Sequence, residues 1–222
     1  MRWLLVGFLL LAGLASAQES HDTYGKTESQ ILKMGMDDWM HFFTSKAGSS
    51  TADMCEGAGI YGEVAQTRND RLLKTEKDRD LKQRVLTLRK LLAKFDSSSI
   101  DVQFAESGGG TMYNPMWASV TGEVEDLLYG FLSRNLRNTK NLVVSDVSKK
   151  LKHLSQLIEK EHQTTPNPEL FKYKEAKEAL AAMDGTFNGI VTIASKMDRR
   201  SSNVLLGFCL ERVQNAIGEE RE

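Results

Sequence analysis

Apolar side chains recur at alternating spacings of three and four residues along much of this chain. The longest such series runs through Tyr173, Ala176, Leu180, Met183, Phe187, Ile190, Ala194, Met197, Ser201, Val204 and Phe208, interrupted only by a serine. This spacing places the side chains on one helical face, and such a stripe must be buried against other helices. We therefore predict an all-α fold: an elongated antiparallel bundle of long, coiled-coil-like helices with one short N-terminal helix.

Helix-start signals and breaks indicate where the first two helices lie. A short helix is expected over about 28–46, after a hydroxyl and a glutamine spaced as in a capping box. A second helix is expected over about 51–95, with a polar stretch at 74–80 that is solvated or slightly unwound. An irregular loop is then expected over 96–113, held to the bundle by Ile100, Val102 and Phe104.

Two Asn-Pro pairs indicate the remaining helix starts, because asparagine is a good N-cap and proline suits the first helical position. Asn114-Pro115 begins a third helix that continues to about Ile158, with a kink candidate at 134–141. Asn167-Pro168 begins a fourth helix that contains the long apolar series. The polar end, 218–222, is expected to fray.

Residues 1–17 have the pattern of a cleaved secretory signal peptide. Arg2 precedes an apolar run, and Ala15-Ser16-Ala17 supplies the small-x-small pattern that signal peptidase cuts. The apolar run is too short to span a bilayer as a helix. We therefore expect residues 18–222 to form a single helical-bundle domain without an integral membrane segment. The expected location is extracellular, or periplasmic if the source is bacterial.

Two cysteines follow the signal, Cys55 and Cys209, and an oxidising compartment favours their pairing. Unbroken antiparallel helices would instead separate the thiols by roughly 60 Å, for about 40 residues at 1.5 Å each. One additional fold-back removes this conflict. The two candidates are Asn138–Asn141, which we favour, and Asp184–Gly189, where two glycines weaken the helix although the apolar phase is unbroken.

The charge balance argues against a nucleic-acid partner. One of the 29 Lys and Arg residues lies in the signal, which leaves 28 against 30 Asp and Glu. Nucleic-acid-binding domains have a basic excess that this chain lacks. The chain is 41% hydrophobic and 27% charged, a composition typical of a folded domain and not of a disordered one.

Patterns that suggest catalysis or metal binding have simpler explanations here. Residues 57–62 match G-x-G-x-x-G, but the dinucleotide motif needs a preceding strand, so we attribute these glycines to close helix packing. Glu159 with His162, and Asp38 with His41, resemble di-metal bundle motifs that would need further inward glutamates. We therefore predict no metal, no cofactor and no catalytic residue.

The first expected helix gathers soft and aromatic side chains on one face, namely Met36, Trp39, Met40 and Phe43. Methionine-rich faces adapt to partners, so this face is the candidate docking surface, although ordinary core packing also explains it. The leading hypothesis is a secreted helical interaction module without catalytic activity, whose partner is another protein or a cell surface. The alternative is a carrier of lipid or another apolar ligand, whose amphipathic helices open onto it.

Overall fold

The computed structural model describes residues 23–105, 111–136, 141–165 and 171–218. Within these ranges the chain forms seven α-helices and no strand, which confirms the predicted all-α bundle. The helices are α1 (Glu28–Ala47), α2 (Thr51–Thr75), α3 (Arg79–Gln103), α4 (Tyr113–Leu132), α5 (Val144–Thr164), α6 (Tyr173–Ala194) and α7 (Arg199–Ile217).

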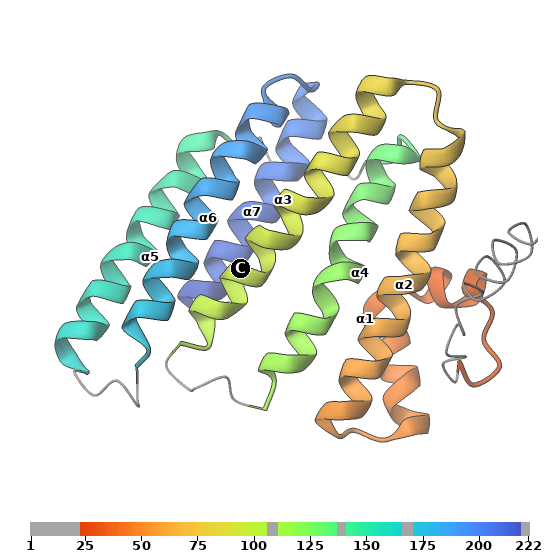
Figure 1. Ribbon diagram of the computed structural model, residues 1–222, viewed down its shortest axis with the longest axis horizontal. Coiled ribbons are helices and arrows are strands. Elements are labelled where there is room, and N and C mark those ends of the chain that lie inside the picture. The colour runs from red at the N-terminus through yellow and green to blue at the C-terminus, as the bar shows by residue number, and fades with distance from the viewer. Residues whose placement is uncertain (1–22, 106–110, 137–140, 166–170, 219–222) are drawn as a thin grey trace, which may run out of the picture.

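From α2 to α7, each helix runs antiparallel to the next helix along the chain (Figure 1). The most extensive contacts are those of α2 with α4 and of α3 with α6, while α7 packs on α5 and α3. α1 packs on α2. The contact between α3 and α4 joins one group of helices, α1, α2 and α4, to a second group, α3, α5, α6 and α7.

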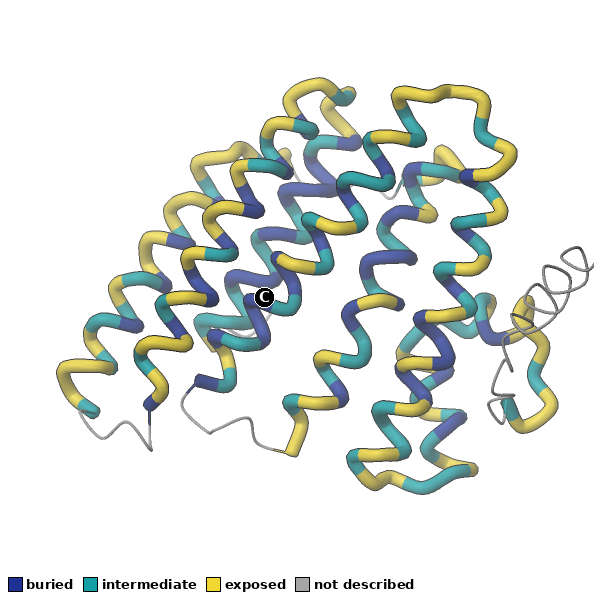
Figure 2. Tube along the Cα trace, viewed as in Figure 1, coloured by how far each residue is buried: buried dark blue, intermediate teal, exposed yellow. Residues whose placement is uncertain are grey.

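Buried residues recur at short intervals along each helix, alternating with more exposed ones (Figure 2). The larger core extends over α3 to α7, where Leu88, Leu92 and Phe95 of α3 are fully buried. The ring of Phe95 lies 6.3 Å from that of Phe187 on α6. A smaller core between α1 and α2 includes Ile31 and Trp39, so the stripes seen in the sequence do face the interior.

The prediction of one continuous helix over 51–95 is wrong, because the chain turns back within this range. α2 ends at Thr75, and α3 begins at Arg79 after three intervening residues. Asp78 caps α3 by accepting hydrogen bonds from two backbone N–H groups, at 2.9 and 3.0 Å. The turn falls inside the polar stretch 74–80, where no apolar side chain holds a continued helix against the bundle.

The fold-back favoured near Asn138 is confirmed, since α4 ends at Leu132 and α5 begins at Val144. Residues 137–140 lie outside the described ranges. The alternative fold-back at 184–189 is helical, within α6. The expected third helix is therefore two antiparallel helices.

The expected fourth helix is also divided, at a turn that the apolar spacing did not reveal. α6 ends at Ala194 and α7 begins at Arg199. The carboxylate of Asp198 caps α7, where it accepts hydrogen bonds from the backbone N–H and the hydroxyl of Ser201 at 3.0 and 2.5 Å. Apolar spacing continues through 194–204 because residues on both sides of the turn face the same core.

The first half of the expected loop over 96–113 is helical, because α3 continues to Gln103. The hydroxyls of Ser97 and Ser99 donate to backbone carbonyls of the preceding turn, at 3.2 and 2.7 Å, so these serines do not end the helix. The inward face of this extension is apolar and buried, through Ile100 and Val102.

The expected disulfide is not present in the structure, where Cys55 and Cys209 are both free thiols. Cys55 is half-buried on α2, which packs on α1 and α4. Cys209 is fully buried on α7, which packs on α3, α5 and α6. The two thiols therefore belong to different groups of helices, although the additional fold-backs remove the end-to-end separation that opposed their pairing.

Three predictions concern residues outside the described ranges: the signal at 1–17, the Asn167 cap, and 219–222 of the frayed end. Among the helices that the structure describes, none combines the length and the apolar character needed to cross a membrane.

Candidate functional site

The face of α1 proposed for docking is used for packing inside the protein. Trp39 and Phe43 are fully buried, and Met36 and Met40 are half-buried. The indole N–H of Trp39 donates to the backbone carbonyl of Gly57 on α2, at 2.7 Å. The structure thus brings these four side chains together as predicted, but it covers their face with other helices of the same chain.

A different concave surface lies at one end of the bundle, between the end of α3 and the beginnings of α4 and α6, at the bottom of Figure 1. We call it the end groove, and its volume is about 480 Å³. The backbone N–H of Lys172 donates to the carbonyl of Ala105 at 3.0 Å, which ties the approach to α6 to the end of α3. Its lining residues are Ser98, Asp101, Phe104, Ala105, Tyr113, Lys172, Glu175, Glu178, Ala179 and Ala182.

The wall formed by α3 and α4 is built around Asp101. One carboxylate oxygen, Oδ1, accepts hydrogen bonds from the hydroxyl of Tyr113 at 2.7 Å and from the indole N–H of Trp117 at 3.0 Å. The ring of Tyr113 meets that of Phe104 edge to face, with the centroids 5.8 Å apart. Burial, and then the bond to Asp101, raise the pKa of Tyr113, so its hydroxyl stays a donor.

Next to this wall, the beginning of α4 exposes two large apolar side chains. Met112 is 47% exposed and Trp117 is 45% exposed, and both are among the most exposed large apolar side chains of the described residues. Trp117 is fixed beside the groove by its bond to Asp101. An exposed indole in a fixed position is a feature of protein-binding surfaces.

The opposite wall, on α6, is acidic. Glu175 and Glu178 are exposed, while Ala179 is buried at the bottom of the groove. Together with Asp101 they bring three carboxylates to the lining, against the single ammonium of Lys172. Lys174 lies 3.9 Å from Glu178, but such an exposed pair on one helix contributes little. The groove therefore presents a negative field over an apolar bottom.

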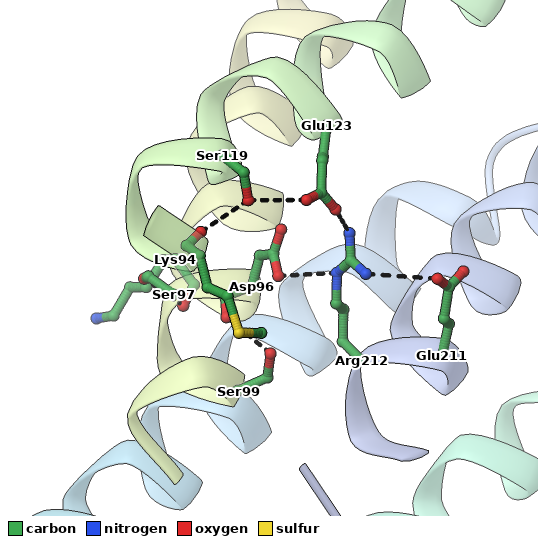
Figure 3. Close-up of polar contacts among 9 residues, drawn as sticks. Lys94, Asp96, Ser97, Ser99, Ser119, Glu123, Glu211 and Arg212 are labelled. Carbon is green, nitrogen blue, oxygen red and sulfur yellow. Dashed lines mark hydrogen bonds and ion pairs between the residues drawn. The ribbon is translucent and has the colours of Figure 1, made fainter. Parts of the chain in front are cut away.

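A buried charge cluster lies where α3, α4 and α7 meet (Figure 3). The guanidinium of Arg212 is ion-paired with Asp96 at 2.8 Å, with Glu123, and with Glu211 at 3.5 Å. Ser119 donates to the other oxygen of Glu123, at 2.8 Å. The guanidinium of Arg212 is thus paired with three carboxylates at the contact between the two groups of helices.

Burial dominates the ionisation of Asp96. This residue is 3% exposed, and within the described structure its Oδ2 accepts no hydrogen bond. Burial raises the pKa of Asp96 to about 6, although the nearby Arg212 acts in the opposite direction. Burial also raises the pKa of the Cys209 thiol, and the charge of Asp96 adds to the effect.

A second buried polar cluster connects α2, α3 and α4. Glu125 is 1% exposed, and its carboxylate is paired with the guanidinium of Arg89 at 2.5 Å. Asn69 donates to the same carboxylate at 2.7 Å, and Asp70 accepts a bond from Arg89 at 2.8 Å. Because ion pairs and hydrogen bonds link these groups to one another, we assign the cluster to the fold and not to ligand binding.

The carboxylate–imidazole pairs noted in the sequence are engaged by other partners or exposed. Glu159 accepts bonds from Tyr173 and Lys177, which lower its pKa, and His162 stacks on Tyr173 with the ring centroids 3.8 Å apart. Within the described ranges, no group of three or more metal-ligating side chains is positioned to hold a metal ion.

The three glycines of the G-x-G-x-x-G match lie within α2. A Cβ atom on Gly57 would lie 2.8 Å from the ring of Phe43 on α1, and one on Gly62 would lie 3.1 Å from Thr121 on α4. Gly59 faces open space. The close helix packing inferred from the sequence is therefore present at two of the three glycines.

The end groove could not be predicted from the sequence. Asp101, Phe104 and Tyr113 fell in the expected loop, while Glu175 and Glu178 looked like ordinary solvated charges of a helix. Only the pairing of α3 with α6 brings the two sets together. Comparison of the chain with protein-family models, with curated proteins and with solved structures found no match.

Proposed function

We propose that this chain is an exported, non-catalytic interaction module that binds a segment of another protein in the end groove. The observation that carries the proposal is the combination of a hollow of about 480 Å³ with an exposed, hydrogen-bonded indole at its edge. Export is supported by the pattern of residues 1–17.

The groove has the features of a binding surface. Its bottom offers apolar contacts at Ala105 and Ala179, and its walls offer directional acceptors at Asp101 and Glu178. Aromatic anchors at the centre and polar groups around them are typical of protein–protein recognition. The seven helices pack their apolar stripes inward, which gives the groove a rigid support.

The alternative, a carrier of an apolar ligand, is supported by the volume of the groove, which lies within the ~300–1,000 Å³ typical of small-molecule sites. The charges argue against the commonest apolar ligands. Glu175 and Glu178 would repel the carboxylate of a fatty acid or the phosphate of a lipid. The protein partner is therefore the better-supported proposal.

Site-specific photocrosslinking tests the proposal. A benzoylphenylalanine in place of Met112 lies next to the groove and leaves the indole of Trp117 in place. One in place of Tyr129, farther along α4, is similarly exposed and lies away from the groove. Each protein is incubated with extracellular fluid from the source and irradiated. We expect a defined crosslinked protein from position 112 that is absent from position 129.

A variant that fills the groove supplies the matched control. Ala182→Phe places a ring in the lining, whereas Ala181→Phe adds the same ring at the neighbouring exposed position outside it. Loss of the crosslink with Ala182→Phe but not with Ala181→Phe supports the proposal. Equal crosslinking by both variants, or crosslinking from positions 112 and 129 alike, would refute it. Copurified lipid that Ala182→Phe displaces would favour the carrier instead.

A further inference from the structure

The charge of the end groove indicates which kind of segment it binds. Three carboxylates and one ammonium line it, an excess of two negative charges over a hollow with low-dielectric walls. Such a surface attracts cations and repels anions, and the concave shape focuses the field. The excess does not depend on a single side chain, because it comes from both Asp101 on α3 and two glutamates on α6.

Asp101 is positioned to receive a donor from outside. Within the described ranges, the hydrogen bonds to its carboxylate come from Tyr113 and Trp117 and both end on Oδ1, so that Oδ2 accepts none from these residues. These bonds fix the plane of the carboxylate.

Water and salt ions can solvate and screen the carboxylates of the groove without a bound partner. The apolar part of the groove therefore matters as much for binding. The buried Ala105 and Ala179 form the bottom, and Phe104 contributes a half-buried ring. A side chain that fills this space removes apolar surface from water on both partners. The groove thus combines acceptors for a cation with room for an aliphatic or aromatic side chain a few ångströms away.

We propose that the occupant of the end groove is a cationic peptide segment of another protein, in which a Lys or Arg adjoins a large apolar residue. The cation pairs with Asp101 and the two glutamates of α6, and the apolar side chain fills the hollow over Ala179. This inference rests on the proposed function and specifies its partner class.

Fluorescence anisotropy with short labelled peptides tests the partner class. The probes are a ten-residue peptide of alternating Leu-Leu and Lys-Lys pairs, the same peptide with Glu for Lys, and one with Ser for Leu. We expect the Leu/Lys peptide to bind at least tenfold more tightly than either of the others. Raising the salt from 50 to 500 mM should weaken its binding several-fold, because salt screens exposed charges.

Variants connect this binding to the groove. Glu175→Gln combined with Glu178→Gln removes two groove carboxylates, and Glu56→Gln combined with Asp38→Asn removes two exposed carboxylates at the α1–α2 end. We expect the first pair to weaken the Leu/Lys peptide about five- to tenfold, at roughly 0.5–0.7 kcal/mol for each rim charge, and the second to change it less than twofold. Equal effects of the two pairs would show non-specific attraction and overturn the proposal.

Spermine distinguishes a peptide partner from a small organic cation. If spermine binds as tightly as the Leu/Lys peptide and competes with it fully, the cation alone is the ligand and the peptide assignment is wrong. The two proposals also fail separately. A groove-dependent crosslink at position 112 without any preference for the cationic peptide supports the interaction module and refutes only the partner class.

Discussion

Replacing Asp96 by Asn tests the buried charge cluster, because it removes a charge while preserving the shape of the side chain. The pKa of Asp96 is raised to about 6 by burial, from an ordinary value of 3.8. The folded protein therefore binds a proton more readily than the unfolded chain between these two values. It follows that Asp96 makes the fold more stable as the pH falls through 6, and that this gain is complete below the unfolded pKa.

The magnitude follows from the two pKa values. They differ by about 2.2, which corresponds to about 3 kcal/mol between high pH and the fully protonated state. Most of this gain in the free energy of unfolding arises at low pH, where other carboxyl groups also titrate. Between pH 7 and pH 5, Asp96 alone should raise the free energy of unfolding by about 1.3 kcal/mol.

The variant isolates this contribution from that of the other acids. At pH 7, Asp96→Asn should be tolerated, because the raised pKa of Asp96 means that the cost of desolvating its carboxylate exceeds the attraction of Arg212. In the variant, Arg212 still has Glu123 and Glu211 as ion-pair partners. The free energy of unfolding of the variant, relative to that of the wild-type protein, should then fall by about 1.3 kcal/mol between pH 7 and pH 5. The reason is that only the wild-type protein gains the proton.

Urea unfolding at both pH values, followed by circular dichroism at 222 nm, measures the difference. Asp38→Asn on the exposed face of α1 is the control, and it should show the same pH dependence as the wild-type chain. Parallel pH profiles for the wild-type protein and Asp96→Asn would refute the reasoning. That result would mean that Asp96 is ionised at pH 5, and hence better solvated or better paired than its burial indicates.

Three further predictions concern packing, capping and thiol reactivity. Gly57→Ala should lower the free energy of unfolding by about 1–3 kcal/mol, because its Cβ would lie 2.8 Å from a buried ring. Gly59→Ala, in open space, should leave it unchanged or raise it by up to about 1 kcal/mol, and urea unfolding distinguishes the two. Asp198→Ala should cost about 1 kcal/mol at pH 7 through the lost cap. Because hydrogen bonds from Ser201 lower the pKa of Asp198, this cost should disappear as the pH falls through that lowered value, which urea unfolding at acid pH checks. A maleimide should label Cys55 in the folded protein but Cys209 only after unfolding, and non-reducing peptide mapping that finds the two joined would contradict their separation on α2 and α7.

Much of the fold could be predicted because burial is periodic in the sequence. Leu88, Leu92 and Phe95 recur at spacings of four and three residues, which places them on one helical face, and all three are fully buried. The turns were harder to predict, because each needs only three or four residues and a capping carboxylate. Asp78 and Asp198 are such caps, yet an isolated aspartate before an apolar series is too common in exposed helices to identify a turn.

The serines at 97–99 show a second reason for failure. Three consecutive serines usually favour loops, since their hydroxyls compete for backbone hydrogen bonds. Here two of the hydroxyls bond back to carbonyls of the same helix, and Ser98 and Ser99 are buried against neighbouring helices. Tertiary packing therefore overrides the local preference, and it extends α3 to the residues that form the end groove.

The position of α3 explains why the candidate site could not be found from sequence spacing. This helix contacts α4, α6 and α7, so it is the element that both groups of helices share. Asp96 faces the buried junction with α7, while Asp101, five residues later, lines the end groove. Both residues fell in the loop expected over 96–113, and their different surroundings arise only from how the neighbouring helices pack on α3.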